Sequence, residues 1–142
     1  MTAMPEILGG VSEETLDLVR RTTEAWNRGD VDSVAANLSP DAEWEVAENN
    51  PDARTLRGRD EIRAYLADWR DTIVGLHYEA TQVLDAADAV VQVGVMTGHI
   101  GEGGPALTAE LCFVTRFVDG EAVRTEEYLD AEDALAAAGL SR

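Results

Sequence analysis

The sequence has few of the residues that disulfides and metal sites require. It contains one cysteine, Cys112, and two histidines in 142 residues. One cysteine cannot form an intrachain disulfide, and three such side chains far apart in the sequence do not suggest a zinc site. Cys112 lies in the apolar run LCFVTRFV, where a small buried side chain is expected rather than a nucleophile. There is no glycine-rich phosphate loop either, so we expect neither a metal ion nor a cofactor.

Basic residues are also scarce. The chain has 11 basic and 28 acidic residues, which gives a formal net charge of −17. Nucleic acids and anionic membranes bind clustered positive charge, so neither is expected as a partner. The first residues show no basic segment followed by a long apolar run. No signal peptide or membrane span is therefore predicted, and a cytoplasmic location is the default expectation.

Hydrophobic residues make up 45% of the chain, enough for one domain over residues 1–142, with a folded core over about 12–140. The spacing of apolar residues separates helices from strands. Helices are expected over 12–29, 31–38, 59–73 and 131–139, with Ser12, Asp30 and Asp130 as N-caps. Strands are expected over 41–47, 76–86, 89–100, 105–118 and 121–129, and a loop over 48–58.

Most of the strands follow one another directly and are joined by short turns, while the helices are grouped separately. This order predicts an α+β fold with antiparallel neighbours rather than a doubly wound sheet. A curved sheet wrapped around the N-terminal helices leaves a concave space between them. Such a space is a natural small-molecule site.

Three segments carry a resemblance to a known family: AWNRGDVDSVAANLSPDAEWE, LRGRDEIRAYLADW and RFVDGEAVRTEEYLDAEDALAAAGL. They resemble the nuclear transport factor 2-like (cystatin-like) superfamily, and within it the SnoaL-like group named after a polyketide cyclase. The resemblance implies a cone-shaped domain with a curved mixed or antiparallel sheet, a pocket inside the cone, and commonly a dimer through the outer sheet face. The fold hosts isomerases, cyclases, dehydratases, epoxide hydrolases and binding proteins, so activity must be argued from the site.

Comparison with members of known activity argues against two mechanisms. The catalytic groups of the ketosteroid isomerases fall on Val46, Phe113 and Thr22, which are neither acids nor tyrosine. The limonene epoxide hydrolases resemble the chain at EYLD, which places their pocket acid on Glu127, but VVQVGVMTG lacks the Arg-x-Asp pair that they need. The base of the polyketide cyclase falls on Asp130, which is also the expected cap of the last helix.

Alternation in the last strand decides which of its two adjacent glutamates points inward. It directs Thr125, Glu127 and Leu129 into the cone, with Val123 extending the set, and directs Glu126 outward. The isomerase comparison assigns the same three positions to the pocket. The remaining predicted ligand-binding residues are Trp26, Trp44, Val46, Tyr65, Trp69, Phe113 and, if its strand stays regular, His99.

Two interpretations of Glu127 are open. Burial raises the pKa of a carboxyl group, which suits a general acid or base. Glu127 would then move a proton at carbon next to a carbonyl, and Tyr65 or His99 would donate a hydrogen bond to the oxyanion. Alternatively, Arg70, Arg124 or a backbone amide holds Glu127 as a structural or ligand-orienting group. The protein would then be a non-catalytic binding module or a dimerisation domain.

The expected partners are a small apolar or polycyclic ligand and a second copy of the chain. The homodimer is predicted to form through the outer face of the sheet. The residues assigned to that surface are Cys112, Val114, Val83, Val90 and Gln92.

Overall fold

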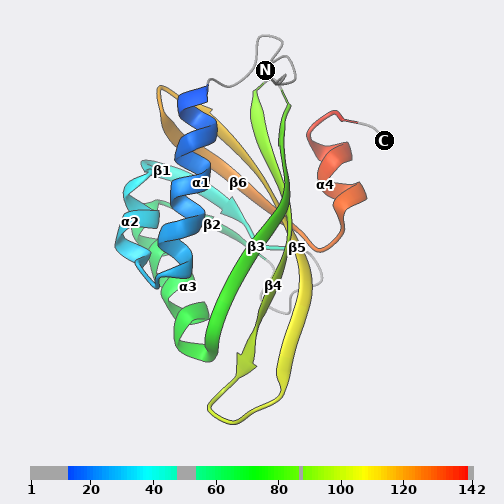
Figure 1. The fold of residues 1–142 in the computed structure, drawn as a ribbon. Helices are drawn as coiled ribbons and strands as arrows, with labels where there is room; N and C mark the ends of the chain where they lie inside the picture. Colours follow the sequence, from blue (N-terminus) through cyan, green and yellow to red (C-terminus); the bar gives the residue numbers. More distant parts are fainter. Residues whose placement is uncertain (1–12, 48–53, 87, 141–142) are drawn as a thin grey trace.

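The structure is a computed structural model that describes residues 13–47, 54–86 and 88–140. The elements over these residues are α1 (Glu13–Asn27), α2 (Val31–Ala36), β1 (Leu38–Glu45), β2 (Thr55–Arg57), α3 (Arg59–Thr72), β3 (Ile73–Asp85), β4 (Ala89–Ile100), β5 (Ala106–Val118), β6 (Glu121–Tyr128) and α4 (Ala131–Ala137) (Figure 1). This is the expected α+β fold. No helix within the described ranges is long and apolar enough to cross a lipid bilayer.

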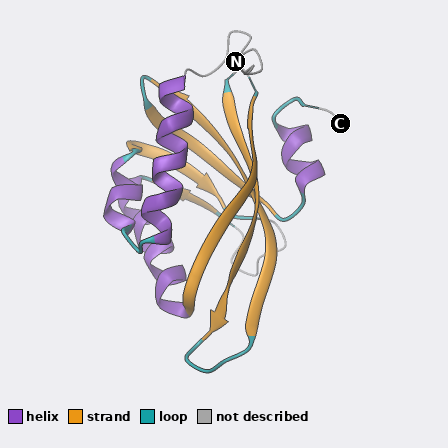
Figure 2. Cartoon of the chain, viewed as in Figure 1, coloured by secondary structure: helices purple, strands orange, loops and turns teal. Residues whose placement is uncertain are grey.

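The strands over the described residues form one mixed sheet in the order β2-β1-β6-β5-β4-β3. Strands β1 and β6 run parallel, and every other pair of neighbours is antiparallel. Helices α1, α2 and α3 lie on one side of the sheet, and α4 lies on the other (Figure 2). We call the side that faces α1–α3 the inner face and the side that faces α4 the outer face.

Local sequence signals account for several element ends. The carboxylate of Asp30 accepts a hydrogen bond from the Ser33 amide at 3.1 Å, and that of Asp130 accepts one from the Glu132 amide at 2.7 Å. Both residues are therefore the predicted N-caps. Asp119 and Gly120 both have positive φ, as a two-residue turn between antiparallel strands requires. The predicted cap Ser12 lies outside the described residues.

Two predicted boundaries are wrong because tertiary contacts override local composition. Leu38 belongs to β1 rather than to the second helix, and its register places it opposite Ala122 of β6. Residues Thr55–Arg57, expected in a loop, form the edge strand β2 against β1. Leu56 is 1% exposed there, and Arg57 forms an ion pair with Glu43 at 2.7 Å.

The dimer surface predicted from the sequence does not exist as a single surface. Cys112 and Val114 lie on the outer face, but both are 0% exposed because they pack in a cluster with Ala134 and Leu135 of α4. Val83, Val90 and Gln92 lie on the inner face. Residues that pair across neighbouring strands lie on the same face of the sheet. Gln92 pairs with both Val83 and Phe113, and Val90 pairs with Thr115; Phe113 and Thr115 both face the helices. The homodimer itself stays a prediction.

Cys112 is expected to be chemically inert in the folded protein. Burial raises the pKa of its thiol to about 11, and α4 packs over its strand. Thiolate is the reactive form, so both effects protect it. We expect a chromogenic disulfide reagent at pH 8 to label Cys112 only after the protein is unfolded in denaturant. Stoichiometric labelling of the native protein within minutes would show that α4 does not cover this strand.

Candidate active site

A cavity of about 780 Å³ lies between the N-terminal helices and the inner face of the sheet. Its wall is mainly apolar and aromatic. Tyr78 of β3 and Phe117 of β5 contribute to it, although neither was predicted. The predicted pocket residues that do line it are Trp26, Trp44, Tyr65, Trp69, Phe113, Thr125, Glu127 and Leu129.

Three predicted site residues lie elsewhere. Val46 is buried in the core cluster that also contains Trp44, but it does not reach the cavity. His99 is exposed on the outer face. It lies on the same face of β4 as Val93, as predicted, but that face is the outer one, because Val93 pairs with the outward-facing Cys112. Asp130 caps α4 and does not line the cavity. Val123 also leaves the inner face, because a bulge in β6 places Ala122, not Val123, opposite Phe117.

Glu127 is the one buried charged side chain among the described residues, with 8% of its surface exposed. Three donors reach its carboxylate. Oε2 accepts hydrogen bonds from Trp44 Nε1 at 2.7 Å and from the Tyr65 hydroxyl at 2.8 Å, and Oε1 accepts one from the Ala47 amide at 3.2 Å. Buried charges need such partners, because an unpaired carboxylate is very costly to desolvate. The two side-chain donors converge on Oε2, which leaves Oε1 the less engaged oxygen.

The aromatic wall holds the two side-chain donors in place. Trp44 packs against Phe113 in an edge-on arrangement with ring centroids 5.9 Å apart. Tyr65 packs edge-on against Trp69 at 6.4 Å. Arg54, which also lines the cavity, places its guanidinium 5.9 Å from the centre of the Tyr65 ring. The donors are thus fixed by packing before any ligand arrives.

Burial raises the pKa of Glu127, and the hydrogen bonds from Trp44, Tyr65 and Ala47 offset this only in part. Among the described residues, no cation lies within ion-pair distance of this carboxylate. Arg70 instead stacks on Trp26 and donates to a backbone carbonyl. Burial, with the nearby charge of Glu127, also raises the pKa of the Tyr65 phenol, so Tyr65 stays a donor at any working pH.

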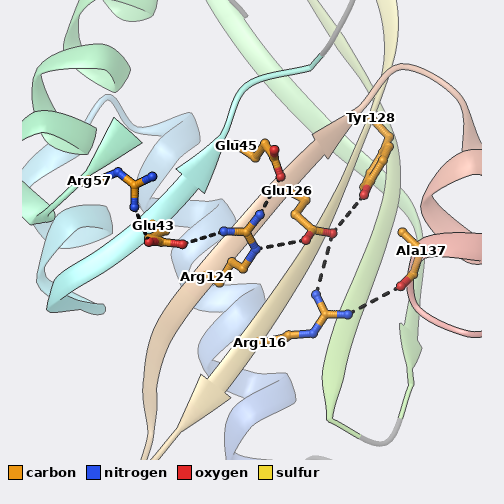
Figure 3. Close-up of polar contacts among 8 residues, drawn as sticks. All are labelled: Glu43, Glu45, Arg57, Arg116, Arg124, Glu126, Tyr128 and Ala137. Atoms are coloured by element: carbon orange, nitrogen blue, oxygen red, sulfur yellow. Dashed lines mark hydrogen bonds and ion pairs between the residues drawn. The ribbon is translucent and has the colours of Figure 1, made fainter. Parts of the chain in front are cut away.

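The neighbouring Glu126 has the opposite environment on the outer face (Figure 3). Arg124 donates to Glu126 at 3.0 Å and also reaches Glu43 and Glu45, while the Tyr128 hydroxyl donates to Glu126 at 2.9 Å. Partial burial would raise the pKa of Glu126, but the bonds from Arg124 and Tyr128 and the charge of Arg116 outweigh it and lower the pKa. The two adjacent glutamates therefore differ: Glu126 is held in an ion pair with a lowered pKa, and Glu127 is buried with a raised pKa.

Replacing Tyr65 by phenylalanine is expected to raise the pKa of Glu127 further. The substitution removes one hydrogen bond that favours the charged carboxylate and changes little else in shape. The matched control is Tyr128→Phe, which removes the equivalent bond to Glu126 on the other face and should raise the pKa of Glu126 alone. Carboxyl-carbon NMR titration of both variants measures the two values. An unchanged or lowered pKa of Glu127 in Tyr65→Phe would contradict the hydrogen bond.

Some of the site could not be predicted from side-chain patterns. The Ala47 amide is a backbone donor two residues after β1, and no sequence motif marks it. Gln92 and Asn37 also line the cavity. Gln92, the isolated glutamine in the apolar run AVVQVGV, was predicted on the dimer surface and lies in the cavity wall instead. No group of three His, Cys, Asp or Glu side chains in the described part of the chain is placed to hold a metal ion.

Comparison with known proteins supports the fold. A family model described as the SnoaL-like domain matches residues 19–125. No curated protein matches the chain. Solved structures match the chain, but their sequence identities are low and establish only the fold.

Three of these structures illustrate the likeness. A nuclear transport factor 2-like protein of unknown function from Burkholderia pseudomallei is 23% identical, with a TM-score of 0.74 over 88% of this chain and 97% of its own. A protein with a ketosteroid isomerase-like fold from Catenulispora acidiphila, in complex with trimethylamine, is 21% identical, with a TM-score of 0.71 over 87% and 93%. TerC, co-crystallised with polyporic acid, is 20% identical, with a TM-score of 0.72 over 90% and 98%.

Proposed function

This chain belongs to the SnoaL-like domain family, and we propose that it is an enzyme without a cofactor that transfers a proton at the carbon next to a carbonyl group. Glu127 is the acid/base of this reaction. One observation carries the proposal: a buried carboxylate with a raised pKa lies in the wall of an apolar cavity large enough for a small organic molecule. The combination of a pocket and a perturbed titratable group is typical of catalytic sites.

In this proposal the less engaged oxygen of Glu127 acts as the base. Oε1, which accepts only the 3.2 Å bond from Ala47, takes the proton from the substrate carbon. The electron pair of the broken C–H bond forms the C=C bond of an enolate, and the carbonyl π pair moves to oxygen. Once Glu127 is protonated its negative charge is gone, and the Tyr65 hydroxyl is free to donate to the enolate oxygen. Tyr65 is thus both the partner of the base and the stabiliser of the oxyanion.

The fate of the enolate decides the overall reaction. Return of the proton to a different carbon gives an isomer. Loss of a hydroxyl group as water, protonated by Glu127, gives a dehydrated product. Attack of the enolate carbon on a second carbonyl, whose oxygen takes the proton, closes a ring. Each of these reactions begins with the same transfer to Glu127, so the transfer is the step to test.

The experiment is deuterium uptake by β-tetralone, a bicyclic ketone with acidic hydrogens next to its carbonyl, followed by proton NMR in D₂O. The protein is expected to exceed an equal concentration of acetate by at least about 100-fold. Its rate should rise with pH as Glu127 loses its proton, with a midpoint above that of an ordinary carboxyl group. A rate no greater than that of acetate would reject the proposal.

A second candidate is a non-catalytic binding module for a small apolar ligand. It is favoured by the completeness of the Glu127 hydrogen bonds, because three donors satisfy the carboxylate without any ligand. In this role the carboxylate ties α3 and the end of β1 to β6. Native mass spectrometry that detects a bound ketone, together with no deuterium uptake on long incubation, would select this function.

A further inference from the structure

A second polar group faces the cavity from the middle of the sheet. Gln92 of β4 is half-buried and lines the cavity wall. Its side-chain N–H donates to the Thr23 hydroxyl at 3.0 Å, and that hydroxyl donates in turn to the Val19 carbonyl at 3.2 Å. Because the Thr23 proton is committed to Val19, Thr23 can only accept from Gln92. This fixes the amide with its nitrogen toward α1.

The carbonyl oxygen of Gln92 is left as an acceptor. Within the described residues, no donor reaches it. The oxygen is not among the buried atoms that lack a partner in the described part of the chain, so it is open to a donor from outside the protein. Asn37 is built in the same way: its side-chain N–H donates to the Thr22 hydroxyl at 2.7 Å, which donates to the Leu18 carbonyl. The helix thus fixes the amide groups and leaves their oxygens for another donor.

The strand register relates Gln92 to the proposed catalytic group. Gln92 pairs with Phe113, and Phe113 pairs with Glu127. Strands β4, β5 and β6 lie side by side in the sheet, so the three residues form one row across it. All three line the cavity on the inner face. Gln92 and Glu127 are two strand spacings apart, which is about 10 Å. The ring of Phe113 lies between these two polar residues as an apolar floor.

We propose that Gln92 is a specificity-determining residue that accepts a hydrogen bond from a hydroxyl group on the substrate, at the end of the molecule opposite its carbonyl. The inference rests on the proposed function for the position of the carbonyl. The substrate class is a fused bicyclic or larger hydroxy ketone that lies over Phe113. Its carbonyl end meets Glu127 and Tyr65, and its hydroxyl donates to the Gln92 carbonyl.

The test compares the affinities of three ketones by isothermal titration calorimetry. They are β-tetralone, its derivative with a hydroxyl on the aromatic ring far from the carbonyl, and the methyl ether of that derivative. The wild-type protein is expected to bind the hydroxyl compound about fivefold more tightly than β-tetralone, as one neutral hydrogen bond allows. The methyl ether cannot donate and should show no such gain.

Two variants test whether Gln92 causes the preference for the hydroxyl compound. Gln92→Met keeps the length of the side chain but removes the acceptor, so both ketones should bind with the affinity of β-tetralone. Gln82→Met is the matched control, because Gln82 is exposed on β3, pairs with the outward-facing Val93, and should leave the preference intact. Thermal unfolding of both variants reports whether the fold is kept.

Several outcomes would overturn the inference. The wild type could bind the hydroxyl compound no more tightly than β-tetralone, or could gain as much affinity from the methyl ether. The preference could survive in a folded Gln92→Met variant. Finally, the wild type could bind neither ketone at millimolar concentration. The wild-type comparison needs no variant to fold. Binding and exchange are separate readouts: a hydroxyl preference without deuterium uptake would reject the proposed function alone, and uptake without the preference would reject this inference alone.

Discussion

Replacing Glu127 by glutamine is expected to abolish proton exchange while the fold stays intact. Glutamine has nearly the same shape, and its oxygen can accept from Trp44 and Tyr65 as Oε2 does. It cannot take a proton from carbon, so the exchange rate on β-tetralone should fall by about 100- to 10,000-fold. β-Tetralone itself should still bind, which calorimetry would show.

The stability of Glu127→Gln follows from the sign of the pKa shift. Burial raises the folded-state pKa above the unfolded value. The stability linked to the protonated form is therefore complete below the unfolded pKa and is lost as the pH rises through the folded pKa. Glutamine is neutral at every pH and avoids this loss, although its amide end loses the bond from Ala47. We expect its free energy of unfolding at neutral pH to lie within about 1 kcal/mol of the wild type.

The matched control is Glu126→Gln, one residue away on the opposite face. It removes the charge that pairs with Arg124, and its single oxygen can keep only one of the bonds from Arg124 and Tyr128, but it touches nothing in the cavity. Its exchange rate should match the wild type. Full activity in Glu127→Gln, or an equal loss in both variants, would show that Glu127 is not the base.

Replacing Gly94 by alanine is expected to be the most destabilising single-methyl change in the sheet. A Cβ there would lie 2.4 Å from the Glu79 carbonyl oxygen and 2.6 Å from two atoms of the Tyr78 ring end. Tyr78 cannot move freely, because it is buried and its hydroxyl donates to the Leu111 carbonyl at 2.8 Å. Overpacking of this kind costs about 3 kcal/mol or more. Thermal unfolding should show a loss of roughly 10 °C in Tm.

Gly101→Ala is the control for the effect of alanine without a clash. A Cβ at Gly101 meets nothing within 4 Å, and only the left-handed backbone, with φ of +79°, opposes the substitution. That strain costs about 1 kcal/mol. If Gly94→Ala loses no more stability than Gly101→Ala, Tyr78 does not pack over Gly94 as the structure shows.

The last strand could be interpreted from the sequence because its two faces differ in chemistry. Glu127 and Thr125 alternate with Arg124 and Glu126, and one face is an apolar cavity while the other is a charged network. When the two faces differ in this way, the alternation of side chains along a strand shows which residues belong to which face. The family resemblance agreed with the same assignment. The exception was Val123, because a β-bulge cannot be seen in a pattern of alternation.

The strand β4 could not be interpreted in the same way, because both of its faces are buried. Val91 and Val93 pack in the cluster under α4, while Gln92 and Met96 line the cavity. An apolar run with no polar face predicts a strand but not its orientation. Placing His99 in the pocket and Gln92 on a dimer surface both followed from this ambiguity. The docking of α4 on the outer face resolves it, and the short sequence of that helix does not reveal where it packs.

The most direct test of the account is the pKa of Glu127 in the unliganded protein, measured together with that of Glu126. Carboxyl-carbon NMR titration gives both values, with Glu127→Gln and Glu126→Gln spectra to assign the signals. The account predicts a pKa for Glu127 above the free glutamate value of about 4.3 and a pKa for Glu126 below it. A pKa for Glu127 at or below that value would mean a solvated or ion-paired carboxylate and would contradict its role as a poised base.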